Sequence, residues 1–85
     1  MRIDDRRLER DIKTIPASAG IYALLYHPTQ KLYIGASRNM RLRIKTHVYA
    51  ITRGANHPMS KDVLAGGLAG LSIQCLEMVD RPSDL

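Results

Sequence analysis

The sequence predicts a small α+β fold in which a three-stranded antiparallel sheet is flanked by helices. Two short apolar segments, residues 21–26 and 31–35, surround a turn that contains a proline and indicate a hairpin. Segments with helical spacing lie on both sides of this hairpin, and a third strand is predicted at residues 71–79. The chain has 85 residues, no internal repeat and no linker, which predicts one domain over residues 1–85.

The first predicted element is an amphipathic helix over roughly residues 4–15. Its apolar side chains recur at helical spacing and are Leu8, Ile12 and Ile15. Asp4 or Asp5 is suited to start this helix, because a side-chain oxygen can accept a hydrogen bond from an unpaired N–H of the first turn. The proline and glycine of residues 16–20 then end it.

The register of the hairpin follows from the alternation of side chains along a strand. We expect the pairing to begin with Tyr26 opposite Lys31, which places Tyr22 opposite Gly35 further along. Tyr22 and Tyr33 then project from the same face as diagonal neighbours. Gly35 leaves space beside Tyr22, where a phosphate can approach. A shift of one residue in the register would undo this arrangement.

A longer helix is predicted from about residue 38 to 53, with Ser37 as its N-cap, followed by a short helix at about 59–64. The apolar stripe that must pack on the sheet consists of Met40, Ile44, Val48 and Ile51. Arg43 and His47 lie on one flank of this stripe, from which Arg43 can reach the tyrosine face. The opposite flank, toward solvent, carries Arg38, Arg41 and Lys45.

The distribution of charge favours a polyanionic partner. The net charge is +5, and the stretch from Ile12 to Lys61 holds eight lysines and arginines without a carboxylate. A block of one sign attracts nucleic acid, although basic side chains also form ordinary solvated surfaces. A membrane is not expected as a partner, because no segment combines these charges with a strong apolar face. No apolar run approaches the roughly 18–20 residues of a membrane helix.

The remaining reactive side chains suggest no metal or disulfide chemistry. Cys75 is the only cysteine, which excludes an intrachain disulfide and a cysteine-based zinc site and predicts a cytoplasmic protein. His27 and His57 both precede proline and are predicted to be turn residues. His47, taken alone, is best interpreted as a histidine at the edge of the core.

Two tripeptides on the adjacent strands of the hairpin, together with residues of the following helix, form a recognisable pattern. The pattern consists of Gly20-Ile21-Tyr22, Tyr33-Ile34-Gly35, Ser37, Arg43 and His47. This combination resembles the GIY-YIG nuclease family, and the resemblance extends over about residues 15–79. The family fold is consistent with the order of elements predicted above.

The resemblance implies an endonuclease that hydrolyses phosphodiesters with a divalent metal such as Mg²⁺. Tyr22 would lie near the attacking water and Arg43 on the scissile phosphate, where a guanidinium offsets the charge of the transition state. Tyr33 and His47 would orient these groups or share the proton, and the division of labour between the tyrosines stays open. DNA is the expected partner, with RNA as the alternative. The residues expected to contact it are Lys31, Gly35, Ser37, Arg38, Arg41, Lys45 and Arg53.

The sequence departs from the family at the metal. The family holds its metal through a glutamate on a helix after the third strand, and the 85 residues contain no such helix. Glu77 matches the end of the strand instead, and Asp80 and Asp84 fall in a turn and at the terminus. No metal ligand is therefore assigned.

Several interpretations of this departure stay open. The chain is a fragment of a longer nuclease, a short form that binds nucleic acid without cutting it, or a protein whose site a partner chain completes. The sheet face left uncovered would suit a homodimer. A protein-interaction domain unrelated to nucleic acid is the remaining alternative.

Overall fold

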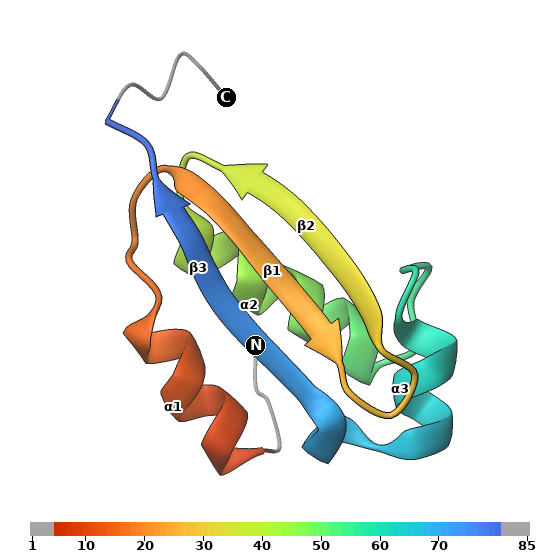
Figure 1. The fold of residues 1–85 in the computed structure, drawn as a ribbon. Helices are drawn as coiled ribbons and strands as arrows, with labels where there is room; N and C mark the ends of the chain where they lie inside the picture. Colours follow the sequence, from red (N-terminus) through yellow and green to blue (C-terminus); the bar gives the residue numbers. More distant parts are fainter. Residues whose placement is uncertain (1–4, 81–85) are drawn as a thin grey trace.

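The computed structural model describes residues 5–80 and shows one sheet with helices on one side of it (Figure 1). The elements in chain order are α1 (Arg6–Thr14), β1 (Gly20–Tyr26), β2 (Lys31–Ser37), α2 (Met40–Thr52), α3 (Ser60–Gly66), a short 3₁₀ turn (Leu68–Gly70) and β3 (Leu71–Met78). The sheet is antiparallel throughout, with the strand order β2-β1-β3. The predicted α+β class and order of elements are confirmed, and the 3₁₀ turn is an addition. No helix within residues 5–80 is long and apolar enough to cross a membrane.

The hairpin has the register that side-chain alternation predicts. Tyr26 pairs with Lys31 and Tyr22 pairs with Gly35, as expected, and the pairing continues to Ser37. The turn at residues 27–30 ends on Gln30, whose φ of 58° lies in the left-handed region. The predicted placement of Tyr22 beside Gly35 is therefore confirmed.

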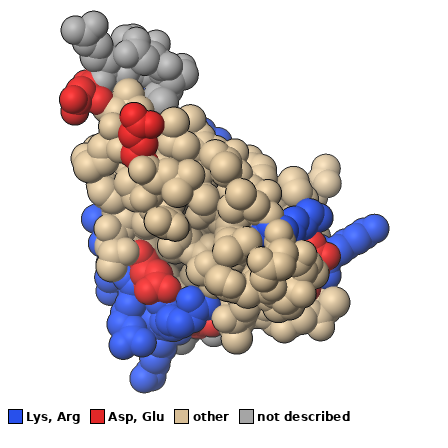
Figure 2. Space-filling view, viewed as in Figure 1, with Lys and Arg blue, Asp and Glu red and all other residues tan. Residues whose placement is uncertain are grey.

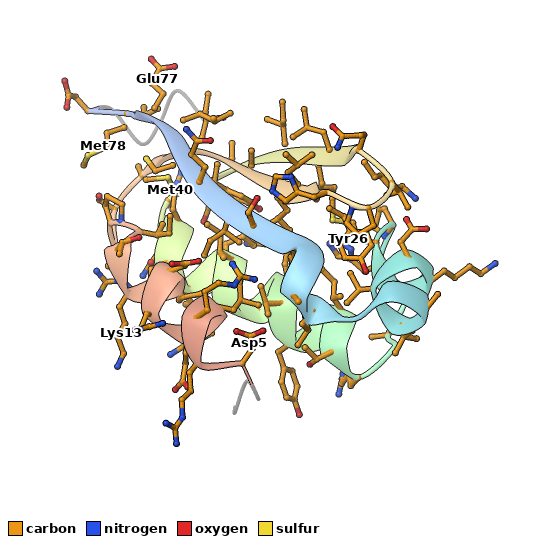
Figure 3. The ribbon with its side chains drawn as sticks, turned by 60° about the horizontal axis from the view of Figure 1, so that its bottom comes forward. Asp5, Lys13, Tyr26, Met40, Glu77 and Met78 are labelled. Atoms are coloured by element: carbon orange, nitrogen blue, oxygen red, sulfur yellow. The ribbon has the colours of Figure 1, made fainter. Side chains whose placement is uncertain are left out.

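The core lies between β1 and α2. The predicted stripe of α2 is fully buried: Met40, Ile44, Val48 and Ile51 are each 0% exposed. From β1, Tyr22, Leu24 and Tyr26 point into the same layer, since alternate residues of a strand share a face. The Tyr26 hydroxyl donates to the Gly67 carbonyl at 2.8 Å, next to α3 (Figure 3). This contact joins the end of β1 to the segment that leads into β3.

The helix starts show one confirmed prediction and one correction. Asp5 caps α1 by accepting from the Leu8 N–H at 2.9 Å, whereas Asp4 lies outside the described residues. The N-cap of α2 is Asn39, which accepts from the Leu42 N–H at 3.1 Å, and not Ser37. Ser37 cannot serve because it is still the last residue of β2. Its hydroxyl contacts the backbone of Asn39 instead.

The opposite face of the sheet carries no helix within residues 5–80. Figure 2 shows that the centre of this face has neither basic nor acidic side chains. Leu32, Ile34 and Leu76 project from it, with exposed fractions of 56%, 56% and 47%. Within residues 5–80 this face of the sheet is therefore apolar and exposed.

Candidate active site

Tyr22 and His47 form the centre of the candidate site. The Tyr22 ring crosses the backbone of Gly35 so closely that a Cβ on Gly35 would lie 2.5 Å from the Tyr22 hydroxyl oxygen. On its other side this oxygen lies 2.8 Å from Nε2 of His47, on α2. The space that Gly35 leaves is thus filled by the Tyr22 ring. It is not left open for a phosphate as the sequence suggested.

Three further contacts enlarge this pair into a cluster of four rings. The Tyr33 ring centre lies 5.2 Å from that of His47 and 5.2 Å from that of His57. The two histidine rings are 5.0 Å apart in an edge-to-face arrangement. Tyr22 is only 2% exposed, whereas Tyr33, His47 and His57 are half-buried. A ligand approaching the cluster therefore meets the latter three rings first.

His57 is the residue that sequence reasoning missed. His57 lies in the predicted loop, but its side chain also joins the cluster, because Nε2 of His57 lies 3.2 Å from Nδ1 of His47. Its own Nδ1 accepts a hydrogen bond from the Met59 N–H at 3.1 Å. The loop between α2 and α3 folds back over α2 to make these contacts, and no periodic pattern reveals such a return. His27, in contrast, is exposed in the β1–β2 turn and bonds to Ser72 at 2.9 Å.

The environment of the cluster favours uncharged side chains at neutral pH. Burial raises the pKa of Tyr22, and Tyr33 adds to this rise while Arg43 opposes it. Burial lowers the pKa of His47, with further lowering by His57 and Arg43. Burial also lowers the pKa of His57. Both imidazoles are therefore neutral, and Tyr22 is a protonated phenol.

Arg43 lies one turn before His47 on α2 and is exposed. Its charge acts on both Tyr22 and His47, as the pKa shifts of these groups show. It also lines a shallow groove of about 570 Å³ at the junction of β2 and α2. The other lining residues are Ala36, Ser37, Arg38, Asn39, Leu42 and Thr46. Tyr22, Tyr33 and His47 are thus brought together between β1, β2 and α2, and Arg43 lies one turn away on α2.

The other basic residues predicted to contact nucleic acid have different surroundings. Arg41 is half-buried against α1, where its guanidinium donates to the Ile15 carbonyl at 2.7 Å and to the Lys13 carbonyl at 3.2 Å. The predicted position in solvent is therefore wrong for Arg41, because the C-terminal carbonyls of α1 attract a cation.

Two more of these cations contact their own chain. The Lys31 ammonium bonds to the Pro58 carbonyl at 2.8 Å and pairs with Asp62 at 3.2 Å. The Arg53 guanidinium stacks 5.2 Å above the ring centre of Tyr49. Arg38 faces the groove, and Lys45 is exposed on α2. Arg38 and Lys45 are therefore better placed to contact a phosphate than Lys31, Arg41 and Arg53, whose charged groups contact other parts of the chain.

The described residues do not fit a divalent metal. Within residues 5–80 no group of three histidine, cysteine or acidic side chains could hold a metal ion. Mg²⁺ prefers carboxylate oxygens, and the ring cluster offers only phenols and imidazoles. Glu77 pairs with Ile21, the neighbour of Tyr22, so it projects to the other face of the sheet. Figure 3 shows Glu77 pointing away from the helices. Asp84 lies outside the described residues.

The fold of the chain is similar to that of two solved structures. The catalytic domain of the homing endonuclease I-TevI superposes with a TM-score of 0.66 over 79% of this chain and 74% of that domain, at 20% identity. A glutamate-to-alanine variant of the same domain, described as an intron endonuclease, gives a TM-score of 0.64 over 78% and 69% of the two chains. The chain therefore has the fold of this endonuclease catalytic domain, and the fold that the sequence resemblance implies is confirmed.

Comparison by sequence finds partial matches to one kind of protein. UvrABC system protein C of Campylobacter jejuni subsp. doylei is 37% identical over 41 residues, which are 48% of this chain and 7% of that protein. The same protein of Campylobacter jejuni subsp. jejuni is 38% identical over 40 residues. The matched region thus spans about 7% of the length of these curated relatives. No protein-family profile matches the chain.

Proposed function

We propose that this chain is the catalytic domain of an endonuclease that hydrolyses DNA phosphodiesters. The observation that carries the proposal is the 2.8 Å contact between Tyr22 and His47, next to an exposed Arg43 at the end of a groove. The structural likeness to the catalytic domain of a homing endonuclease supports DNA as the substrate, with RNA as the second candidate. The lone thiol of Cys75 suits the reducing cytoplasm.

The scissile phosphate is assigned to Arg43. Its guanidinium is exposed and bordered by the groove, so a phosphate can reach it without a rearrangement of the core. Two parallel N–H donors match two phosphate oxygens and offset the charge that grows in the transition state. No carboxylate is hydrogen-bonded to Arg43 within residues 5–80, so its charge is available to the substrate.

The attacking water is assigned to the tyrosines. Tyr22 is a protonated phenol in the structure and acts as a base only after its pKa falls. Arg43 works in this direction, since its charge lowers the pKa of Tyr22 against the effect of burial. Tyr33 is half-buried in front of the cluster and orients the water from the side of the solvent. This division assigns proton transfer to Tyr22 and positioning to Tyr33.

The divalent metal of the family belongs to the proposal as well. Because residues 5–80 contain no group of three side chains that could hold a metal ion, and Glu77 projects to the other face of the sheet, we assign its ligand to a residue outside this range. No step of the mechanism above passes through the metal.

The test compares two alanine variants in a DNA-nicking assay with Mg²⁺ or Mn²⁺. We expect Arg43→Ala to lower the rate by at least about 100-fold, the range for loss of one transition-state donor. Lys45→Ala removes an equally exposed charge from α2 and serves as the control, with a loss of less than about tenfold. Cutting by Arg43→Ala at a near-normal rate would exclude the proposed role.

The second candidate is a nucleic-acid-binding module without catalysis, and it is supported by the exposed cations Arg38, Arg43 and Lys45 beside a ring cluster that, within residues 5–80, belongs to no group of three metal-binding side chains. This function predicts no nicking with any metal but binding that weakens steeply with salt, as counterions compete for the phosphates. Affinity that does not respond to salt would contradict both candidates. It would favour a protein-interaction domain instead.

A further inference from the structure

We propose that His57 is a positioning residue, which fixes the tautomer of His47 so that Nε2 of His47 donates its hydrogen to the Tyr22 oxygen. The inference deepens the proposed nuclease function and rests on it for its catalytic meaning. It concerns a loop residue that the sequence predicted to be a simple turn residue.

The direction of the hydrogen-bond chain is set by Met59. A backbone N–H can only donate, so Nδ1 of His57, 3.1 Å from the Met59 nitrogen, must be the acceptor and carry no hydrogen. A neutral imidazole has one hydrogen, which in His57 is therefore on Nε2. That atom lies 3.2 Å from Nδ1 of His47 and donates to it. The hydrogen of neutral His47 is consequently on Nε2, 2.8 Å from the Tyr22 hydroxyl oxygen.

The groups around His47 favour the neutral forms on which this argument depends. Tyr22 from β1 and Tyr33 from β2 contact its ring, Arg43 lies one turn earlier on α2, and His57 comes from the α2–α3 loop. The guanidinium disfavours a second positive charge on His47. Protonation of His57 would place a hydrogen on Nδ1, directly against the Met59 N–H.

This order of donors distinguishes two ways in which Tyr22 could take part in hydrolysis. A relay, in which Tyr22 passes its proton to Nε2 of His47 while taking one from water, requires that Nε2 be unprotonated. The chain from Met59 prevents this. Tyr22 can instead release its proton to solvent and act as a phenolate, whose oxygen receives the His47 hydrogen bond. The phenolate then takes the proton of the attacking water to become a phenol again, while the hydroxide bonds to phosphorus and the leaving oxygen takes a proton from solvent. His57 thereby holds His47 in the state that stabilises the phenolate.

The test records the ¹⁵N signals of the histidine rings of the whole chain by NMR at pH 8. We expect protonated Nε2 and unprotonated Nδ1 for both His47 and His57. His57→Ala should shift His47 toward the other tautomer, because Nδ1 loses its donor. His57→Gln, whose amide can still donate to Nδ1, should keep the original tautomer. His27→Gln is the control and should leave the His47 signals unchanged.

The NMR measurement and the nicking assay test this inference and the nuclease proposal separately. A His47 that carries its hydrogen on Nδ1 in the unaltered protein overturns the inference, and so does a tautomer that His57→Ala leaves unchanged. Neither result depends on cutting. Where nicking is measured, His57→Ala should lose about 10- to 100-fold in rate, as for other residues that orient a reacting group. His57→Gln should recover most of this loss, whereas equal losses in both variants would show a merely structural role.

Discussion

Replacing Gly35 by alanine should test the close approach of Tyr22 to β2. The new Cβ would lie 2.5 Å from the Tyr22 hydroxyl oxygen and 2.6 Å from Cζ, whereas ordinary contacts begin near 3.4 Å. The ring would have to move by about 1 Å, and it is held by His47 at 2.8 Å on the other side. Overpacking of a buried group costs about 1–3 kcal/mol. A displacement of 1 Å in a catalytic group costs about 100-fold in rate.

Two measurements check this prediction. Urea unfolding of Gly35→Ala should show a free energy of unfolding lowered by about 1–3 kcal/mol. DNA nicking should be slower by about 100-fold. Tyr22→Leu removes the part of the ring that collides, so the double variant should be less destabilised than the sum of the two single variants. Unchanged stability and unchanged nicking in Gly35→Ala would refute the packing argument. Strict additivity of the two substitutions would show that the residues do not collide.

Three further predictions concern charge. The pKa of His47 and of His57 is lowered in the folded state, so the free energy of unfolding should fall as the pH drops below about 6.5, because the unfolded chain takes up protons first. Urea unfolding measured between pH 7.5 and 5.5 should show that the free energy of unfolding depends less on pH in His57→Gln than in the unaltered protein. In Arg43→Ala the pKa of His47 should rise in an NMR titration, and an unchanged value would place Arg43 elsewhere. Lys45→Ala should reduce the slope of the logarithm of the DNA-binding constant against the logarithm of the salt concentration by about one, which corresponds to one lost phosphate contact. Arg41→Ala should mainly lower the free energy of unfolding, since the Arg41 guanidinium bonds to α1.

The local parts of this structure could be predicted from the sequence. The register of the hairpin depends on the alternation along β1 and β2 and on the turn between them, and both are encoded by neighbouring residues. The buried stripe of α2 likewise follows from its period, and the four predicted catalytic residues inherit their places from these two elements. Asn39 replaces Ser37 as the N-cap only because pairing with β1 extends β2 by two residues. That extension depends on the pairing of β2 with β1 and not on the local propensity of the two residues.

The path of the α2–α3 loop back over α2 could not be predicted, because no periodic pattern in the sequence links the loop residues to the residues that they contact. His57 reaches His47 only when residues 53–59 fold back over α2, and Lys31 contacts this loop through a hydrogen bond to the Pro58 carbonyl. The sequence shows Lys31 and Arg41 as part of one acid-free basic block, yet the structure gives both of them intramolecular carbonyl partners.

The basic block therefore contains two kinds of cation with different consequences. Lys31 and Arg41 neutralise carbonyl dipoles and fix the loop and α1, so their removal acts on stability first. Arg38, Arg43 and Lys45 project from the groove and from the exposed side of α2, where charge is free to meet a phosphate. Net charge alone predicts an equal share of binding for every cation of the block. The geometry predicts that binding resides in the second group and that catalysis requires Arg43, because it alone also acts on Tyr22 and His47.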